Sequence, residues 1–122
     1  MTHISRIEST PRRSRAVVYN GIVFIGGQTA DDRTQDIRGQ TVETLAKIDA
    51  LLREVGSERS RLLTAQIWIK DIARDFTGMN EVWDAWTVPG ASPTRATAQC
   101  LMAKPEVLVE IVVTASVGPS DD

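Results

Sequence analysis

The dipeptide Asn20-Gly21 most constrains the fold, because it stands between two short runs of apolar and aromatic residues, 16–19 and 22–25. A two-residue Asn-Gly connection favours a type I′ turn, whose backbone twist matches that of paired antiparallel strands. The sequence therefore predicts a β-hairpin over residues 16–25.

Two longer segments have the period of a helix. Apolar residues recur at steps of three and four over 42–55 and again over 76–86, which predicts two amphipathic helices. Gly56 is the expected C-cap of the first helix. Asp75 is the expected N-cap of the second, and Pro89-Gly90 ends it.

Three further segments are predicted as strands. Residues 63–70 alternate between apolar and polar side chains, and 91–102 and 107–115 follow as two more strands. The resulting order ββαβαββ predicts an α+β fold, in which one mixed sheet has both helices on the same face. Residues 1–122 are expected to form a single domain, with 1–12 and 118–122 as flexible tails.

The face of this sheet without helices would expose large side chains to solvent. By parity, the helix-covered side cannot take all of the large side chains Tyr19, Trp68, Leu101, Leu108 and Val112. A small sheet that exposes such a surface is a site of association. We therefore expect a closed homo-oligomer.

The last two predicted strands each carry a charge near the middle, Arg95 and Glu110. If residues 103–106 form a hairpin loop, Arg95 faces Thr114 and Glu110 faces Gln99. A polar stripe on the side away from the helices would then consist of Arg95, Thr97, Gln99, Glu110 and Thr114. Arg95 and Glu110 would lie about 13 Å apart along the ladder, so a shared site needs a second chain or a bridging ligand or water.

Composition argues against several kinds of chemistry and partner. The single cysteine, Cys100, excludes an intrachain disulfide and a multi-cysteine zinc site. The only histidine, His3, stands in the terminus that is expected to be flexible, which argues against a Ser-His or Cys-His pair. A net charge of −2 gives no general attraction to nucleic acid. No apolar run reaches the roughly 18 residues of a membrane span, and the N-terminus lacks a signal-peptide core. We expect a cytoplasmic protein without metal, cofactor, nucleic-acid partner or membrane partner.

A family resemblance emerges from the C-terminal part of the chain. Ser92-Pro93-Thr94-Arg95, followed fifteen positions after the arginine by Glu110 in Val109-Glu110-Ile111, resembles the signature of the RidA (YjgF) family of reactive intermediate deaminases. The segments Ser14-Arg15-Ala16-Val17, Gly26-Gly27-Gln28 and Asp75-Phe76 extend the similarity, which covers about 13–115. The resemblance implies a chorismate-mutase-like fold, a homotrimer and a ligand cleft at each subunit interface.

The resemblance also implies roles for particular residues. Arg95 matches the arginine that clamps the substrate carboxylate, and Glu110 matches the acid that holds or activates the attacking water. Gly27 matches a glycine whose backbone lines the cleft, and Asn80 matches an asparagine at the same helix position. Thr97, in the polar stripe, and Arg13 are further candidates for substrate binding.

Two positions depart from the family pattern and indicate a divergent branch. Arg13 stands where a tyrosine is common, and Gly26 stands where a serine supplies a hydroxyl that can hold ligand or water. The carboxylate clamp is kept, whereas the substrate specificity is open.

The chemistry expected from these residues is hydrolysis of 2-imino or enamino acids to 2-keto acids and ammonia. Such a reaction needs a carboxylate anchor, a water aimed at C2 and a route for protons, and it requires neither a metal nor a covalent nucleophile. The resemblance implies a deaminase of the 2-iminobutanoate/2-iminopropanoate type. Two alternatives stay open: a trimer that senses a small carboxylate without turnover, and an RNA-directed activity, which the acidic balance disfavours.

Overall fold

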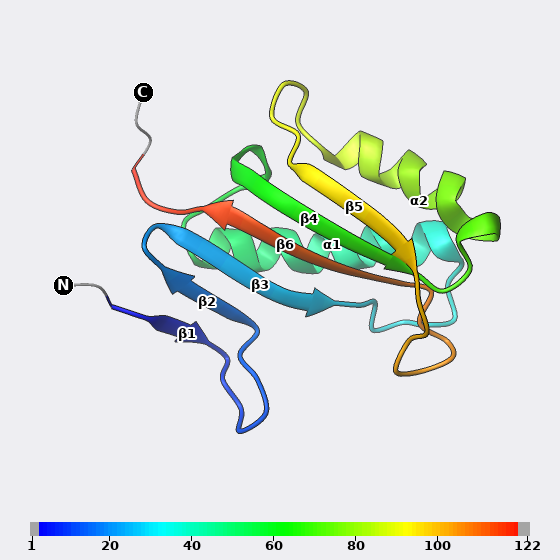
Figure 1. Ribbon diagram of the computed structural model, residues 1–122, viewed down its shortest axis with the longest axis horizontal. Helices are drawn as coiled ribbons and strands as arrows, with labels where there is room; N and C mark the ends of the chain where they lie inside the picture. Colours follow the sequence, from blue (N-terminus) through cyan, green and yellow to red (C-terminus); the bar gives the residue numbers. More distant parts are fainter. Residues whose placement is uncertain (1–2, 120–122) are drawn as a thin grey trace.

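A computed structural model describes residues 3–119 and shows a six-stranded sheet with two α-helices packed on one of its faces (Figure 1). The elements in chain order are β1 (Ser5–Ile7), β2 (Ala16–Tyr19), β3 (Ile22–Gln28), α1 (Ile37–Glu54), the 3-10 turn η1 (Arg59–Arg61), β4 (Leu62–Ile69), α2 (Ile72–Trp86), β5 (Thr94–Gln99) and β6 (Val109–Ser116). The strand order is β1-β2-β3-β6-β4-β5, with β4 and β5 parallel and the other neighbours antiparallel. The α+β class and the mixed sheet with both helices on one face are confirmed.

The predicted hairpin is formed by β2 and β3. Tyr19 pairs with Ile22, so Asn20 and Gly21 are the turn residues, and their φ values of 54° and 75° are those of a type I′ turn. Asparagine and glycine tolerate positive φ better than other residues, which is why this dipeptide sets the register of the hairpin.

An additional strand lies in the predicted N-terminal tail. The sequence predicts a flexible tail over 1–12, but Ser5–Ile7 pair with β2 as β1. Three residues are too few to show an alternating pattern, so this pairing has no clear signal in the sequence. The observed order is therefore βββαβαββ. Residues 1–2 and 120–122 of the two predicted tails lie outside the described residues.

Helix α1 begins five residues before the predicted start. Asp36 is its N-cap, and the Asp36 carboxylate accepts a hydrogen bond of 2.9 Å from the Gly39 amide. The first turns bury polar side chains: Gln40 is fully buried and donates from Nε2 to the Glu106 carbonyl at 3.0 Å. Because part of the buried face of α1 is polar, the periodic spacing of apolar residues does not reveal where the helix begins. Val42, which the period assigned to the buried face, is 57% exposed.

Helix α2 also begins earlier than its predicted cap. Asp71 is the N-cap and accepts a hydrogen bond from the Arg74 amide at 3.2 Å, whereas Asp75 lies inside the helix. The Asp75 carboxylate is buried and accepts hydrogen bonds from the Arg74 guanidinium at 3.1 and 2.9 Å. The predicted cap was therefore wrong: the aspartate four residues earlier in the chain begins the helix.

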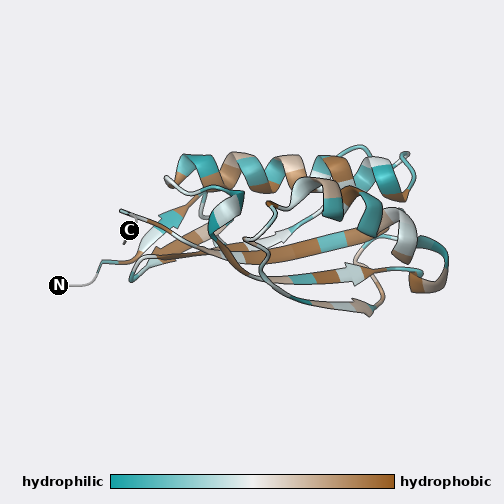
Figure 2. Cartoon of the chain, turned by 90° about the horizontal axis from the view of Figure 1, so that it is seen from above, coloured by the Kyte–Doolittle hydropathy of each residue, from teal (hydrophilic) through white to brown (hydrophobic). Residues whose placement is uncertain are grey.

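The hydrophobic core lies between the sheet and the helices, where apolar bands on both layers face each other (Figure 2). Its largest fully buried apolar side chains are Ile25, Leu45, Ile48, Leu52, Ile67, Ile69, Met79 and Ile111. Burial of each such side chain contributes about 1.5–3 kcal/mol. Burial alternates along the whole of β6 and along β4 from Ala65 onward, so the odd positions of these two segments face this core.

The last two strands do not form the predicted hairpin. β4 lies between them, with β5 parallel to it on one side and β6 antiparallel on the other. The connection runs over 100–108 and is longer than the four-residue loop that the sequence predicts. In this arrangement β4 has hydrogen-bonded neighbours on both edges, and only β5 is left as an edge strand on that side.

The predicted polar stripe is consequently divided between the two faces. Arg95 pairs with Ala65 and shares its helix-covered side, as do Thr97 and Gln99 farther along β5. Glu110 pairs with Trp68 on the opposite side, which also carries Thr114. The register assumed for a β5–β6 hairpin was wrong, and it had put Arg95 on the wrong face.

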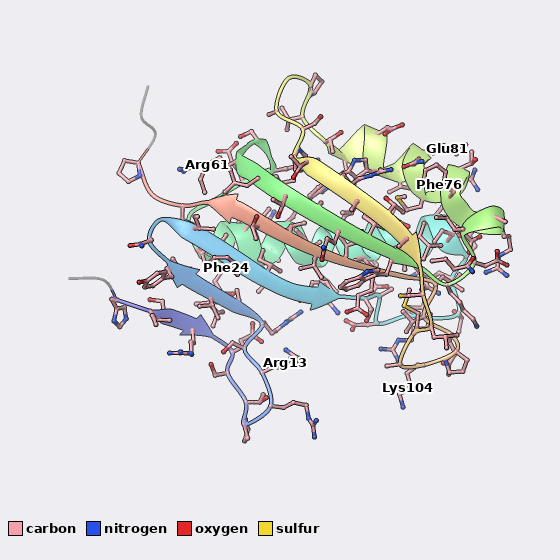
Figure 3. All side chains as sticks on the ribbon, in the orientation of Figure 1. Arg13, Phe24, Arg61, Phe76, Glu81 and Lys104 are labelled. Atoms are coloured by element: carbon pink, nitrogen blue, oxygen red, sulfur yellow. The ribbon has the colours of Figure 1, made fainter. Side chains whose placement is uncertain are left out.

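We refer to the sheet surface opposite the helices as the helix-free face; Figure 3 looks onto it. Its large side chains are Tyr19, Phe24, Trp68 and Val112. Tyr19 and Phe24 are 40% and 46% exposed. Of the other residues expected in this surface, Leu108 packs against the core and Leu101 is exposed in the 100–108 connection.

Candidate functional site

Arg95 is held by two side chains of α2. Its Nη1 donates a hydrogen bond of 2.7 Å to Asn80 Oδ1, and its Cζ lies 5.6 Å from the centroid of the Trp83 ring. Asn80 and Trp83 are three residues apart and therefore lie on one face of the helix. The structure thus brings together two predicted site residues, Arg95 and Asn80. Trp83 is a third participant, which its place in an apolar helical stripe gave no reason to select.

Thr97 lies two residues beyond Arg95 on the same side of β5. Its hydroxyl is buried and has no hydrogen-bond partner within residues 3–119. In a single chain, the Thr97 hydroxyl is therefore turned away from solvent, while the Arg95 side chain is exposed.

Glu110 lies against a β-bulge in β3. Ile25 pairs with Val113 and Gln28 with Ile111, so β3 has one more residue than β6 over this stretch. At the bulge, the Glu110 carboxylate approaches the backbone of Gly27 so closely that a Cβ on residue 27 would overlap it and lie 3.0 Å from Cδ. Gly27 is needed for this approach, and the structure brings together a second predicted pair, Gly27 and Glu110.

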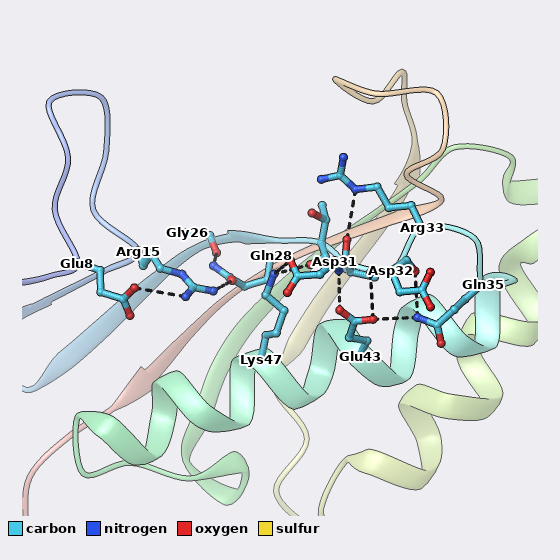
Figure 4. A network of polar contacts seen from close by, with 12 residues as sticks. Glu8, Arg15, Gly26, Gln28, Asp31, Asp32, Arg33, Gln35, Glu43 and Lys47 are labelled. Carbon is cyan, nitrogen blue, oxygen red and sulfur yellow. Dashed lines mark hydrogen bonds and ion pairs between the residues drawn. The ribbon is translucent and has the colours of Figure 1, made fainter.

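The bulge is tied to β2 by a buried glutamine. Arg15 Nη2 donates to Gln28 Oε1 at 2.9 Å, and Gln28 Nε2 donates to the Gly26 carbonyl at 2.9 Å (Figure 4). The Gly26 amide in turn donates to the Arg15 carbonyl at 2.9 Å. These contacts fix the backbone of the bulge, in which Gly27 lies against the Glu110 carboxylate. Arg15 and Gln28 were within the recognised motifs, but sequence gave neither of them this role.

Arg13 lies in a polar cavity of about 600 Å³ between α1 and the β1–β2 connection, and Gly27 lines the same cavity. Lys47 of α1 closes one side: its Nζ donates to the Thr29 carbonyl and to Asp31 Oδ1, both at 2.9 Å. The hydrogen bond and the charge of Lys47 hold the pKa of Asp31 below its ordinary value, with smaller contributions from Arg15 and Arg33. The cavity therefore has a cationic lining that is partly neutralised by its own acids.

The predicted site residues form two separate groups. We call Arg95, Asn80 and Trp83 the arginine half-site, and Glu110 with Gly27 the glutamate half-site. The first lies on the helix-covered side of the edge strand β5, and the second lies on the helix-free face, with β4 between β5 and β6. Within residues 3–119 no ion pair joins Arg95 to Glu110. One chain alone does not bring the two half-sites together.

Two other features bear on the chemistry of the described chain. Among residues 3–119, His, Cys, Asp and Glu side chains form no group of three that could hold a metal ion. Neither helix of this part is both long and apolar enough to cross a membrane.

The fold places the chain in a class of protein with many solved members. An uncharacterized protein from Pseudomonas aeruginosa has a TM-score of 0.92 and 40% identity, over 95% of this chain and all of that one. A YjgF family member from Neisseria meningitidis has a TM-score of 0.92 and 38% identity, over 97% and 98% of the two chains. The class is therefore that of the YjgF-type α+β proteins.

Sequence comparison gives the family. The RutC family protein YoaB of Escherichia coli is 40% identical over 114 residues, which are 93% of this chain and 98% of that protein. A RutC family protein of Haemophilus ducreyi is 39% identical over 94% of this chain and 97% of its own length. The family model described as Endoribonuclease L-PSP matches residues 3–117. The chain belongs to this family, also called YjgF or RidA, as the sequence motifs predicted, and membership is consistent with a broad imine-processing role.

Proposed function

We propose that this protein hydrolyses reactive 2-imino and enamino acids to 2-keto acids and ammonia, in clefts between the subunits of a homotrimer. The observation that carries the proposal concerns Arg95 and Glu110. The Arg95 guanidinium uses Nη1 for Asn80 and keeps other N–H donors for a ligand, and the Glu110 carboxylate lies on the opposite face of the same sheet. A symmetric oligomer repeats both half-sites around an axis, so the arginine half-site of one subunit can meet the glutamate half-site of the next. Arg13 would add positive charge beside Gly27.

The proposed reaction begins with the substrate carboxylate on Arg95, because a guanidinium fork binds both carboxylate oxygens at once. Water attacks C2, so that a C–O bond forms and the C=N π pair moves to nitrogen, while Glu110 takes a proton from the water and delivers it to that nitrogen to give a carbinolamine. Glu110 then carries the hydroxyl proton to the nitrogen, and the C=O bond forms as the C–N bond breaks and ammonia leaves. No electrons are exchanged with a cofactor, so the balance closes with substrate and water alone.

Assembly is supported by the helix-free face. Phe24 and Tyr19 expose large aromatic surface there, and the same face carries Trp68 and Val112. Large exposed apolar surface is uncommon on soluble monomers and marks association sites. A trimer that covers this face would also shield the Glu110 carboxylate, which strengthens its interactions with a bound water and substrate.

A second candidate function is binding of a small carboxylate without turnover. Position 26 carries glycine where the family pattern has serine, so the hydroxyl that can hold water beside Gly27 is missing. Glycine is not required at position 26 by lack of space, since a Cβ there would lie at an ordinary 3.5 Å from the Arg15 carbonyl. The loss of that hydroxyl favours a sensor with an intact carboxylate clamp.

The deciding experiment measures 2-keto acid release from imines that an amino-acid oxidase generates in place from alanine or 2-aminobutyrate. We expect the protein to accelerate release beyond the spontaneous rate, and Arg95→Ala to abolish the acceleration while the trimer persists. Calorimetric titration with pyruvate runs in parallel. Pyruvate binding without acceleration would establish the sensor. If the protein neither accelerates 2-keto acid release nor binds pyruvate, both candidate functions are excluded. Cleavage of an added RNA would favour the endoribonuclease activity that the family model's description names.

A further inference from the structure

We infer that Trp83 and Asn80 are positioning residues that hold the Arg95 guanidinium in one orientation, so that its free edge is ready for a carboxylate before any ligand arrives. The inference rests on the proposed function only in assigning that carboxylate to an imino or keto acid. The geometry of the three side chains stands independently of turnover.

Trp83 gives Arg95 a rigid support. The indole is 5% exposed, and it packs against Trp86 with ring centroids 5.5 Å apart and an interplanar angle of 43°. A ring enclosed in this way cannot follow the motion of a surface side chain. The contact of 5.6 Å between Arg95 Cζ and the ring centroid therefore restricts where the guanidinium can lie.

Asn80 restricts the remaining freedom of the guanidinium. Its Oδ1 accepts one N–H of Nη1 at 2.7 Å, which fixes how the planar group is turned above the ring. A guanidinium has five N–H donors, and a carboxylate uses two of them. Within the described chain, Asn80 is the one hydrogen-bond partner of the Arg95 side chain, so Nε and Nη2 remain available as a pair.

A second arginine of this protein shows the same support with the carboxylate already present. Arg59 Cζ lies 5.4 Å from the centroid of the Trp86 ring. Its Nε and Nη2 donate to the two carboxylate oxygens of Asp49, each at 3.2 Å, while Nη1 donates to the Trp86 carbonyl at 3.0 Å. A tryptophan beneath, a carbonyl-type oxygen on Nη1 and a carboxylate on Nε and Nη2 thus occur together in this fold.

Arg95 has the first two of these three contacts: the tryptophan and the oxygen on Nη1. The third, a carboxylate on Nε and Nη2, is the contact that a ligand would supply. Holding the side chain in place before binding lowers the rotamer entropy lost when the ligand is bound, and this raises affinity without adding a contact to the ligand. The positioning residues should therefore affect KM and ligand affinity more than kcat.

The test compares Trp83→Leu with Trp86→Leu. Both changes remove a buried indole and its contact with an arginine, so both should lower the melting temperature, but only Trp83 lies beneath Arg95. We expect Trp83→Leu to weaken pyruvate binding by about three- to tenfold, the range of a partly shielded cation–π contact. Trp83→Phe should recover much of the loss, and Trp86→Leu, which keeps the indole beneath Arg95 but loosens its packing, should weaken binding clearly less than Trp83→Leu. Equal weakening by the two leucine variants would overturn the inference.

Asn80 gives a test that does not disturb the core. Asn80→Ala should weaken pyruvate binding to a similar degree and leave the melting temperature nearly unchanged. Asn80→Asp should weaken it by about tenfold or more, because the new carboxylate pairs with Arg95 and competes with the ligand. Unchanged affinity in both variants would show that Asn80 has no positioning role.

NMR relaxation of the Arg95 Nε–H in the unliganded protein separates this inference from the proposed function. The group should be ordered in the wild type, slightly more mobile in Trp86→Leu and Trp83→Phe, and most mobile in Asn80→Ala. A mobile Nε–H in the wild type would refute preorganisation even if imines are hydrolysed. An ordered Arg95 Nε–H in a protein that does not hydrolyse imines would support the positioning role and exclude only the proposed enzymatic activity.

Discussion

Glu110 is the residue on which hydrolysis, as opposed to binding, depends. Glu110→Gln keeps the shape of the side chain but removes the proton acceptor, so imine hydrolysis should fall by about a hundredfold, in the range of a general base. Pyruvate affinity should stay the same or become tighter, because a negative charge near the ligand is lost. Initial rates and calorimetry on the same preparation measure the two effects. Equal rates in wild type and variant would exclude Glu110 as the proton acceptor.

The two adjacent glycines of the bulge make different demands on space. A Cβ on residue 27 would overlap the Glu110 carboxylate, whereas a Cβ on residue 26 has ordinary contacts of 3.5 Å or more. Gly27→Ala should displace the carboxylate and lower the rate of hydrolysis by at least about tenfold, within the range for loss of a positioned base. Gly26→Ala should leave the rate near that of the wild type. If both substitutions have the same effect, Gly27 has no special role in placing Glu110.

At the scale of elements, the turn and the existence of both helices follow from local patterns, whereas the starts of the helices and the long-range strand pairing were predicted wrongly. Asn20-Gly21 dictates its turn through the φ values that only a few residues tolerate, so the hairpin could be predicted. The choice of β4 rather than β6 as the partner of β5 depends on residues about thirty positions away in the chain, and the alternating pattern of β5 fits either partner. Arg95 and Glu110 were therefore recognised by motif, whereas the faces they occupy, and the support from Trp83, required the tertiary structure.

The loop between β3 and α1 is fastened by an ion pair that gives it a pH dependence. Lys47 lowers the pKa of Asp31 from its ordinary 3.8. A carboxyl group with a lowered folded-state pKa contributes stability that is complete above the unfolded pKa and is lost as the pH falls through the folded one. The Asp31 side chain is 81% exposed, so the contribution at neutral pH should not exceed about 1 kcal/mol.

Asp31→Asn should therefore lower the melting temperature slightly at pH 7 and lose this difference from the wild type below about pH 3.8. Thermal melts of both proteins from pH 7 to pH 3 measure the difference. A difference that stays constant across this range would show that the Asp31–Lys47 pair is not its source. Lys47→Met should keep part of its effect at low pH, because it also removes the hydrogen bond to the Thr29 carbonyl.

For the whole molecule, the helix-free face should be the surface through which subunits associate. Phe24 on this face and Phe76 on α2 are 46% and 40% exposed, so they offer a matched pair on different surfaces (Figure 3). Phe24→Glu should prevent the proposed trimer from forming, because it would place a charge in an apolar contact that excludes water. Phe76→Glu should leave it intact. Sedimentation at micromolar concentration measures both, and a wild-type monomer under these conditions would remove the trimer and its clefts.

If each cleft takes Arg95 from one subunit and Glu110 from the next, two inactive variants should restore each other. Arg95→Ala and Glu110→Gln are each expected to lack most of the activity as pure trimers. In randomly mixed trimers a cleft is intact when the subunit that supplies the arginine is Glu110→Gln and its neighbour is Arg95→Ala. This combination occurs at about one interface in four in an equal mixture with closed threefold symmetry. Mixing after reversible dissociation should therefore recover about a quarter of the wild-type rate, and a mixture that stays inactive would place both residues in a site formed by one chain.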